Sequence, residues 1–139
     1  RHVGGEAEIG ADLPLGFSVD AQASHGRHTY RFDRPVLSLP QASEAISFGD
    51  DVDTAPRWIA GVRARWNSGD DRIEAELEWL HLGRYFLDAA NSAIYPGHDL
   101  VHLRAQWSVT ERLALTFALR NVLDALYAER GDLAFGNER

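Results

Sequence analysis

The sequence predicts an all-β fold, an antiparallel up-and-down meander of about six strands. Two observations support this fold class. Six segments alternate apolar and polar residues with a period of two, as strands with two different faces do. The connections between these segments are alternately short and long. The length of 139 residues suits one structural unit, and we take residues 1–139 as a single domain.

The clearest strand pattern runs from Arg72 to Trp79, where every second residue is charged and the residues between are apolar. Five other segments repeat this alternation with different residues. Because neighbouring side chains of a strand point to opposite faces, each segment has one apolar and one polar face. The six predicted strands cover residues 6–11, 17–24, 58–66, 72–79, 100–107 and 113–120.

A helical alternative exists for two of these segments. Residues 72–84 place apolar side chains at helical spacing, and residues 113–130 are rich in good helix formers. A helix would, however, spread Glu74, Glu76 and Glu78 around much of its circumference. We therefore prefer strands for both segments.

The connections differ in length in a regular way. Short turns are predicted at residues 12–16, 67–71 and 108–112, and long connections at residues 33–56, 83–98 and beyond Asn121. In a meander, this alternation places all short turns at one end and all long loops at the other. Outer-membrane barrels have this asymmetry, with short periplasmic turns and long extracellular loops, although soluble sandwiches also vary their loops.

The charges around the middle turn predict a pairing register. Setting Arg65 beside Glu74 and Arg63 beside Glu76 closes a four-residue turn and places opposite charges side by side. The neighbouring register on the same face would oppose Arg65 and Arg72, which repel each other. The first register is the prediction.

Four tryptophans mark the predicted apolar face. Trp58 and Trp66 lie on one face of one strand, eight residues and therefore roughly 26 Å apart at about 3.3 Å per residue. Trp79 and Trp107 fall on the same face at strand ends. That spacing approaches the height of the apolar band of an outer-membrane barrel, which aromatic girdles flank. We predict that this face meets lipid and that the charged face lines a water-filled lumen. The alternative is that the tryptophans fill a soluble core.

Composition excludes several classes of function. No apolar stretch approaches the roughly 20 residues of a membrane-spanning helix. The net charge is −7, and all 14 cationic residues are arginine, so we expect no nucleic-acid partner. Cysteine is absent, which excludes disulfides and thiolate metal sites. Residues 1–11 lack the apolar stretch of a signal peptide, so we expect either a missing N-terminus or a protein that is not exported.

Three segments carry a resemblance to a known family: residues 83–88 (GRYFLD), 95–104 (YPGHDLVHLR) and 121–128 (NVLDALYA). Together they resemble the C-terminal barrel region of TonB-dependent outer-membrane receptors. Asn121, Asp124 and Tyr127 match the Asn-x-x-Asp-x-x-Tyr element that follows the penultimate strand in that family. The likeness covers residues 55–139 well and residues 1–54 only through strand rhythm.

The resemblance implies a segment of a larger transmembrane β-barrel of about 22 strands, whose lumen holds a plug. It implies energised uptake of a ferric siderophore, with haem, cobalamin or oligosaccharide as alternatives, in the outer membrane of a Gram-negative bacterium. The implied partners are this small nutrient, outer-membrane lipid and the TonB complex, which would act through an N-terminal region. The chain is expected to lack the plug and the last strand, and we expect no cofactor and no enzymatic activity.

Candidate ligand-binding residues lie in the long loops or at their edges. Arginine and aromatic side chains there suit an anionic iron chelate. The candidates are Arg31, Arg34, Arg84, Tyr85, Tyr95 and His98.

Catalytic and metal sites are less well supported. His25 and His28 face opposite sides of a predicted strand and cannot both ligate one metal ion without a bend. The glutamates of residues 74–78 suit a solvated face better than acid/base catalysis, and Asn121, Asp124 and Tyr127 suit turn hydrogen bonds better than catalysis. Two other functions stay open: a soluble β-sandwich or β-barrel binding module, and a barrel lipase, for which no suitable serine and histidine are evident.

Overall fold

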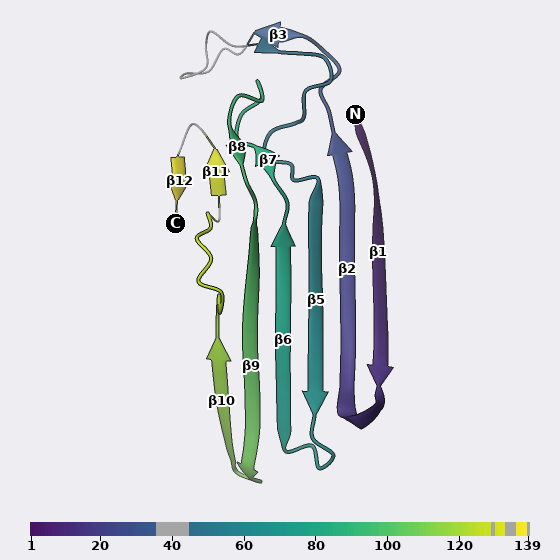
Figure 1. Ribbon diagram of the computed structural model, residues 1–139, viewed down its shortest axis with the longest axis vertical. Coiled ribbons are helices and arrows are strands. Elements are labelled where there is room, and N and C mark those ends of the chain that lie inside the picture. The colour runs from purple at the N-terminus through teal and green to yellow at the C-terminus, as the bar shows by residue number, and fades with distance from the viewer. Residues whose placement is uncertain (36–44, 129, 133–135, 139) are drawn as a thin grey trace.

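The computed structural model describes residues 1–35, 45–128, 130–132 and 136–138, and its main feature is one six-stranded antiparallel sheet (Figure 1). The sheet follows chain order, so the all-β meander predicted from the sequence is confirmed. Its strands are β1 (His2–Leu13), β2 (Phe17–His28), β5 (Trp58–Asn67), β6 (Ile73–Leu82), β9 (His98–Thr110) and β10 (Leu113–Leu119). The sheet is not closed, and β1 and β10 are its edges.

Short turns and long connections separate to the two ends of the sheet, as predicted (Figure 1). The short turns join β1 to β2 through a 3-10 turn at Pro14–Gly16, β5 to β6, and β9 to β10. We call the opposite end, which carries the long connections, the loop end. Two of the long connections there contain short hairpins, β3 (Arg34–Pro35) with β4 (Ala45–Ile46) and β7 (Tyr85–Phe86) with β8 (Ile94–Tyr95).

The long connection predicted beyond Asn121 also contains a short hairpin in its described part, β11 (Arg130–Asp132) with β12 (Gly136–Glu138). Residues 129, 133–135 and 139 lie outside the described part of the chain.

The predicted register between β5 and β6 is wrong by two residues. Arg65 pairs with Glu76 and Arg63 with Glu78, rather than with Glu74 and Glu76. The observed register also sets opposite charges side by side, so charge could not distinguish the two pairings.

The turn between β5 and β6 explains the observed register. The Ser68 hydroxyl accepts hydrogen bonds from the backbone N–H groups of Arg72 (3.1 Å) and Ile73 (2.9 Å) and donates one to Asp70 (2.6 Å). Asp71 takes a positive φ of 55°, which aspartate tolerates better than most residues. These local bonds favour a longer turn than the four residues that were predicted.

The sheet is a single layer with little interior. Among the residues whose burial is described, the buried hydrophobic ones are Ile46, Tyr95, Leu100 and Ala128, all at or near the loop end. Large apolar side chains of the long strands are instead exposed, including Ile9 (71%) and Phe117 (55%). In the described part of the chain, no helix is long and apolar enough to cross a membrane.

Candidate ligand-binding surface

The sheet has a charged face that crosses all of its central strands. One row of neighbours on this face comprises Asp20, Arg63, Glu78 and His102, and the next comprises Ser18, Arg65, Glu76 and Arg104. A guanidinium nitrogen of Arg63 lies 2.6 Å from Glu78 and another lies 3.6 Å from Glu76, while Arg65 contacts Asp20. Each arginine of β5 is therefore neutralised by carboxylates of the neighbouring strands.

Three shallow hollows lie along this charged face. The one over β1, β2 and β5 has a volume of about 380 Å³ and contains Glu6 and Glu8 among its lining residues. The other two, of about 180 and 250 Å³, lie over β5 and its neighbours and are lined by Arg63, Arg65 and their carboxylate partners. Open, charged hollows of this kind suit contact with water, a polar ligand or a segment that fills the space beside the sheet.

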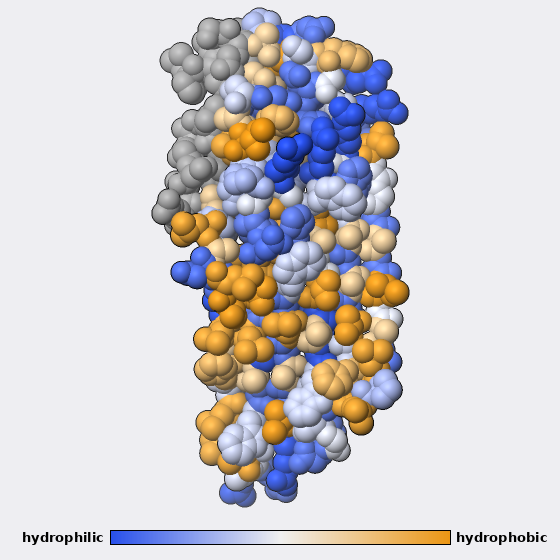
Figure 2. All heavy atoms as spheres, viewed as in Figure 1, coloured by the Kyte–Doolittle hydropathy of each residue, from blue (hydrophilic) through white to orange (hydrophobic). Residues whose placement is uncertain are grey.

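The opposite, apolar face carries the tryptophans. Figure 2 shows this face: an apolar band crosses the sheet, and hydrophilic side chains gather above it at the loop end. The Trp66 indole N–H donates to the Leu15 carbonyl (3.1 Å), and the Trp79 indole donates to Asp99 (3.0 Å). Apolar rings with satisfied polar edges are typical of a boundary between an apolar medium and water.

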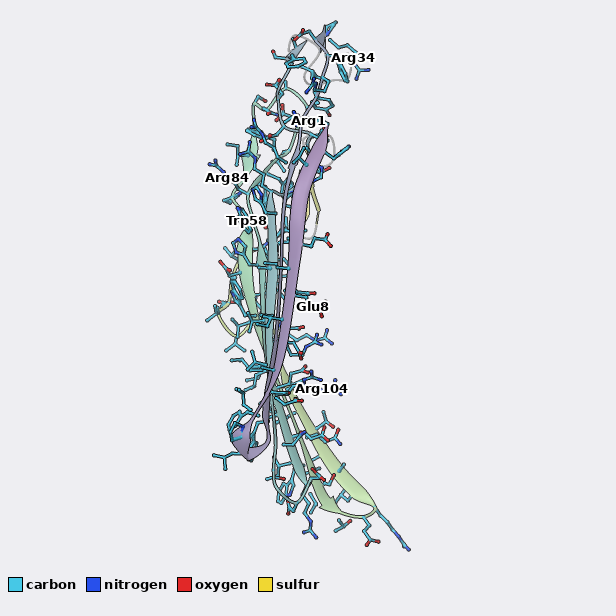
Figure 3. All side chains as sticks on the ribbon, turned by 90° about the vertical axis from the view of Figure 1, so that its right-hand side faces the viewer. Arg1, Glu8, Arg34, Trp58, Arg84 and Arg104 are labelled. Carbon is cyan, nitrogen blue, oxygen red and sulfur yellow. The ribbon has the colours of Figure 1, made fainter. Side chains whose placement is uncertain are left out.

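Figure 3 separates the two faces directly. Trp58 and Arg84 project from one side of the sheet, and Glu8 and Arg104 from the other. The faces therefore differ along the length of the strands, as a wall between lipid and water requires.

Three of the predicted ligand-binding residues come together at the loop end. Tyr85 pairs with Tyr95 between β7 and β8, with ring centroids 5.1 Å apart. The Tyr95 hydroxyl lies 2.8 Å from His98 Nδ1 and accepts a hydrogen bond from the backbone N–H of Ala128 (3.1 Å). Tyr95 is only 6% exposed, so its described contacts join chain segments and leave little ring surface for a ligand.

Arg31 and Arg34 lie beyond the end of β2 and are exposed. The Arg31 guanidinium lies over the Phe48 ring at 5.0 Å, and that of Arg34 lies over Phe32 at 5.5 Å. Such stacking leaves the edges of a guanidinium able to bind an anion.

Arg84 is separate from Arg34 and projects from the Trp58 side of the sheet (Figure 3). The structure therefore does not gather the six predicted ligand-binding residues into one site.

The sequence of this sheet matches that of a known protein family. The family model described as TonB dependent receptor-like, beta-barrel, matches residues 1–122. The chain belongs to this family. The match spans all six long strands, including residues 1–54, where the resemblance rested on strand rhythm alone. Neither a curated protein nor a solved structure was found to match the chain.

In this receptor segment, Asn121 closes the turn after β10. Its amide oxygen accepts from the Ala125 N–H (3.0 Å), and its amide nitrogen donates to the Ala125 carbonyl (2.9 Å). Asn121 and Asp124 both have φ near +50°, and the Tyr127 ring lies 5.0 Å from that of His98. The motif thus connects the end of β10 to the tyrosine and histidine cluster at the loop end.

One cluster in the receptor segment was not anticipated from the sequence. The Asp51 carboxylate lies 2.5 Å from an Arg57 nitrogen and 3.7 Å from Arg27 Nε. The Asn91 side chain holds the Asp51 backbone through two hydrogen bonds of 2.8 Å. Its amide oxygen accepts from the Asp51 N–H, and its amide nitrogen donates to the Asp51 carbonyl. A signal for this cluster was present in the acidic stretch of residues 50–53, which begins shortly before Arg57.

His25 and His28, the two histidines considered as metal ligands, lie on opposite faces of the sheet. The His25 ring packs against Trp58 at 4.5 Å on the apolar face, whereas His28 pairs with His2, their Nδ1 atoms 2.5 Å apart. Among the described residues, no group of three or more histidine, aspartate or glutamate side chains could hold a metal ion.

Proposed function

We propose that this segment forms part of the wall of an outer-membrane receptor that imports a small nutrient by TonB-dependent transport in a Gram-negative bacterium. Receptors of this family are transporters of the outer membrane. The observation that carries the proposal is that a matched family segment has one tryptophan-marked apolar face and one charged face. Lipid suits the first face and a water-filled lumen suits the second.

The open edges of the sheet indicate that it forms part of a barrel wall rather than a complete transporter. In hydrocarbon, unpaired backbone groups at a strand edge cost several kcal/mol each, so spanning sheets close into barrels. Both β1 and β10 have one side without a strand partner in the described sheet. We infer that further strands pair with these edges in a barrel of about 22 strands, the size of plugged outer-membrane transporters.

The proposed nutrient is an anionic iron chelate such as a ferric siderophore. Support comes from the exposed guanidinium groups of Arg31 and Arg34 at the loop end, because arginine binds planar anionic groups through several hydrogen bonds. We propose that the cluster of Tyr85, Tyr95 and His98 holds the β7–β8 loop, and that the bonds between Asn91 and Asp51 join this loop to the connection that carries Arg31 and Arg34. Haem, cobalamin and oligosaccharide are the other candidates for the nutrient.

Uptake of a radiolabelled ferric siderophore tests this function. The full-length receptor would be expressed in a strain without other receptors for that chelate, with and without an active TonB complex. We expect uptake that needs both the receptor and TonB. Uptake without TonB would refute the transport mechanism.

Two variants test the proposed ligand contacts. A receptor with both Arg31→Gln and Arg34→Gln should bind the chelate about 30-fold more weakly, because each arginine contributes about 1 kcal/mol and the two add to about 2 kcal/mol. Arg72→Gln, at the opposite end of the sheet, is the matched control. TonB-dependent uptake of another nutrient, with no binding of the chelate, would refute the ligand and leave the transport function standing.

A further inference from the structure

Three arginines line one cleft at the loop end of the sheet. Arg27, Arg57 and Arg84 border a hollow of about 220 Å³, together with Tyr85, Phe86 and Ile94. The cleft therefore combines guanidinium groups with aromatic and aliphatic surface.

The cleft adjoins the apolar face rather than the charged one. Arg27 pairs with Val3 across β1 and β2, and it follows His25 at the spacing of two residues that keeps both on one face. His25 in turn packs against Trp58. Arg84 projects from the Trp58 side of the sheet (Figure 3). These arginines thus lie just beyond the tryptophan that marks the loop-end boundary of the apolar band.

Gly83 fixes the position of Arg84. Its backbone N–H donates to the Trp58 carbonyl (2.8 Å), and a Cβ atom at residue 83 would lie 2.9 Å from that carbonyl oxygen. Only glycine permits this close approach without displacement of the backbone. Arg84 is consequently held beside Trp58 at the boundary of the apolar face.

The charges of the cleft do not cancel. Asp51 is paired with Arg27 and Arg57, and the Asp50 carboxylate accepts a hydrogen bond from the Ser47 N–H (2.7 Å). No ion pair joins Arg84 to any residue that the structure describes. Three guanidinium groups against two carboxylates leave one positive charge, and Arg84 is exposed.

A larger hollow continues from this cleft. Arg27 and Gly49 line both, and the second hollow, of about 570 Å³, is bordered by Val3, Phe48 and Arg31. Positive charge above an apolar surface matches the chemistry of a lipid, whose anionic headgroup lies above its acyl chains.

We propose that the arginine cleft formed by Arg27, Arg57 and Arg84 binds the phosphate of an outer-leaflet glycolipid. This inference rests on the proposed function, because only a barrel in the outer membrane places the cleft against the outer leaflet. Guanidinium groups recognise phosphate oxygens in pairs, and the headgroup of a neighbouring lipid is within reach of this position. The lipid would anchor the loop end of the barrel wall at the membrane surface.

Native mass spectrometry of the full-length receptor in an uncharged detergent tests the proposal. The probe is lipid A, the phosphorylated glycolipid of the outer leaflet, compared with its dephosphorylated form. We expect Arg84→Gln to weaken lipid A binding about fivefold, the effect of one arginine near an anionic lipid surface, and Arg84→Lys to retain most of it. Arg72→Gln, at the short-turn end, should bind lipid A as the native receptor does.

Two further measurements identify the source of the phosphate and separate this inference from the function. Millimolar inorganic phosphate should not displace lipid A; displacement would indicate a site for free phosphate and overturn the lipid assignment. If folded Arg84→Gln and Arg72→Gln receptors bind lipid A equally well, the cleft is not the lipid site. The proposed function in TonB-dependent uptake would be unaffected by that result. Heat-modifiable mobility on a gel verifies that each variant is folded.

Discussion

Replacing Gly97 with alanine should destabilise the barrel wall more than any other glycine substitution at the loop end. Gly97 has a φ of +85°, and a Cβ atom there would lie 2.3 Å from the Leu82 carbonyl oxygen. The left-handed backbone costs a residue with a Cβ about 1–2 kcal/mol, and forced displacement of packed atoms costs about 1–3 kcal/mol more. We therefore expect Gly97→Ala to lower the free energy of unfolding by about 2–5 kcal/mol.

Three other glycines separate the two causes. Gly49 has a φ of +98° but open space, Gly83 has ordinary φ but a close contact with Trp58, and Gly69 has neither constraint. The free energy of unfolding should fall by about 1–2 kcal/mol in Gly49→Ala and by about 1–3 kcal/mol in Gly83→Ala, and it should not change in Gly69→Ala. Urea unfolding of the full-length receptor in lipid vesicles, followed by tryptophan fluorescence, measures each value. If Gly97→Ala costs no more than Gly49→Ala, the close approach to Leu82 does not exist.

Three further results are expected. Leu77→Arg, on the apolar face, should cost about 2–4 kcal/mol in vesicles, while Gln106→Arg on the charged face should cost little; equal costs would contradict the assignment of the faces. Ser68→Ala should cost about 1 kcal/mol, by loss of the turn bonds, and an unchanged urea midpoint would argue against them. Burial, and then the 2.6 Å hydrogen bond to Asp53, raise the pKa of Tyr30 to about 12. Because this pKa is raised, the contact stabilises the loop below about pH 10 and is lost as pH rises through about 12. The difference in tyrosinate absorbance between native and Tyr30→Phe receptors should therefore titrate near pH 12, and a midpoint near 10 would contradict it.

The strands and their two faces could be predicted because both are local properties of the sequence. Alternation within residues 72–79 determines which side chains share a face, whatever the partner strand does. A two-residue error in register therefore left the faces intact: Ala64 still lies beside an apolar residue, Leu77, and Arg65 beside a glutamate. The order of the strands could be predicted for a similar reason, because a short turn joins two strands that lie side by side in the sheet.

The register and the loop contacts could not be predicted because they depend on pairs of residues that the pattern does not connect. Charge favoured two registers equally, and the hydrogen bonds of Ser68 distinguish them. Asn91 binds the backbone of Asp51 from 40 residues away, which no local signal indicates. The burial of Tyr95 likewise depends on Ala128, which follows the motif at residues 121–127 and returns to the loop end. Candidate ligand residues chosen by type therefore include a side chain that joins segments together.

Arginine has opposite surroundings on the two faces of the sheet. On the charged face, Arg63 and Arg65 each contact a carboxylate of a neighbouring strand, so their charges stay within the wall. Beyond Trp58 on the apolar side, Arg27 and Arg57 share the Asp51 carboxylate, and Arg84 is exposed with no ion pair to a described residue. The chain has no lysine, so residue type cannot make this distinction. Within the strands, the period of two makes it for Arg27, Arg63 and Arg65. Arg57 and Arg84 lie just outside β5 and β6, where contacts with Asp51 and with Trp58 place them instead. A wall between lipid and water thus needs the correct pairing of its strands as well as their composition.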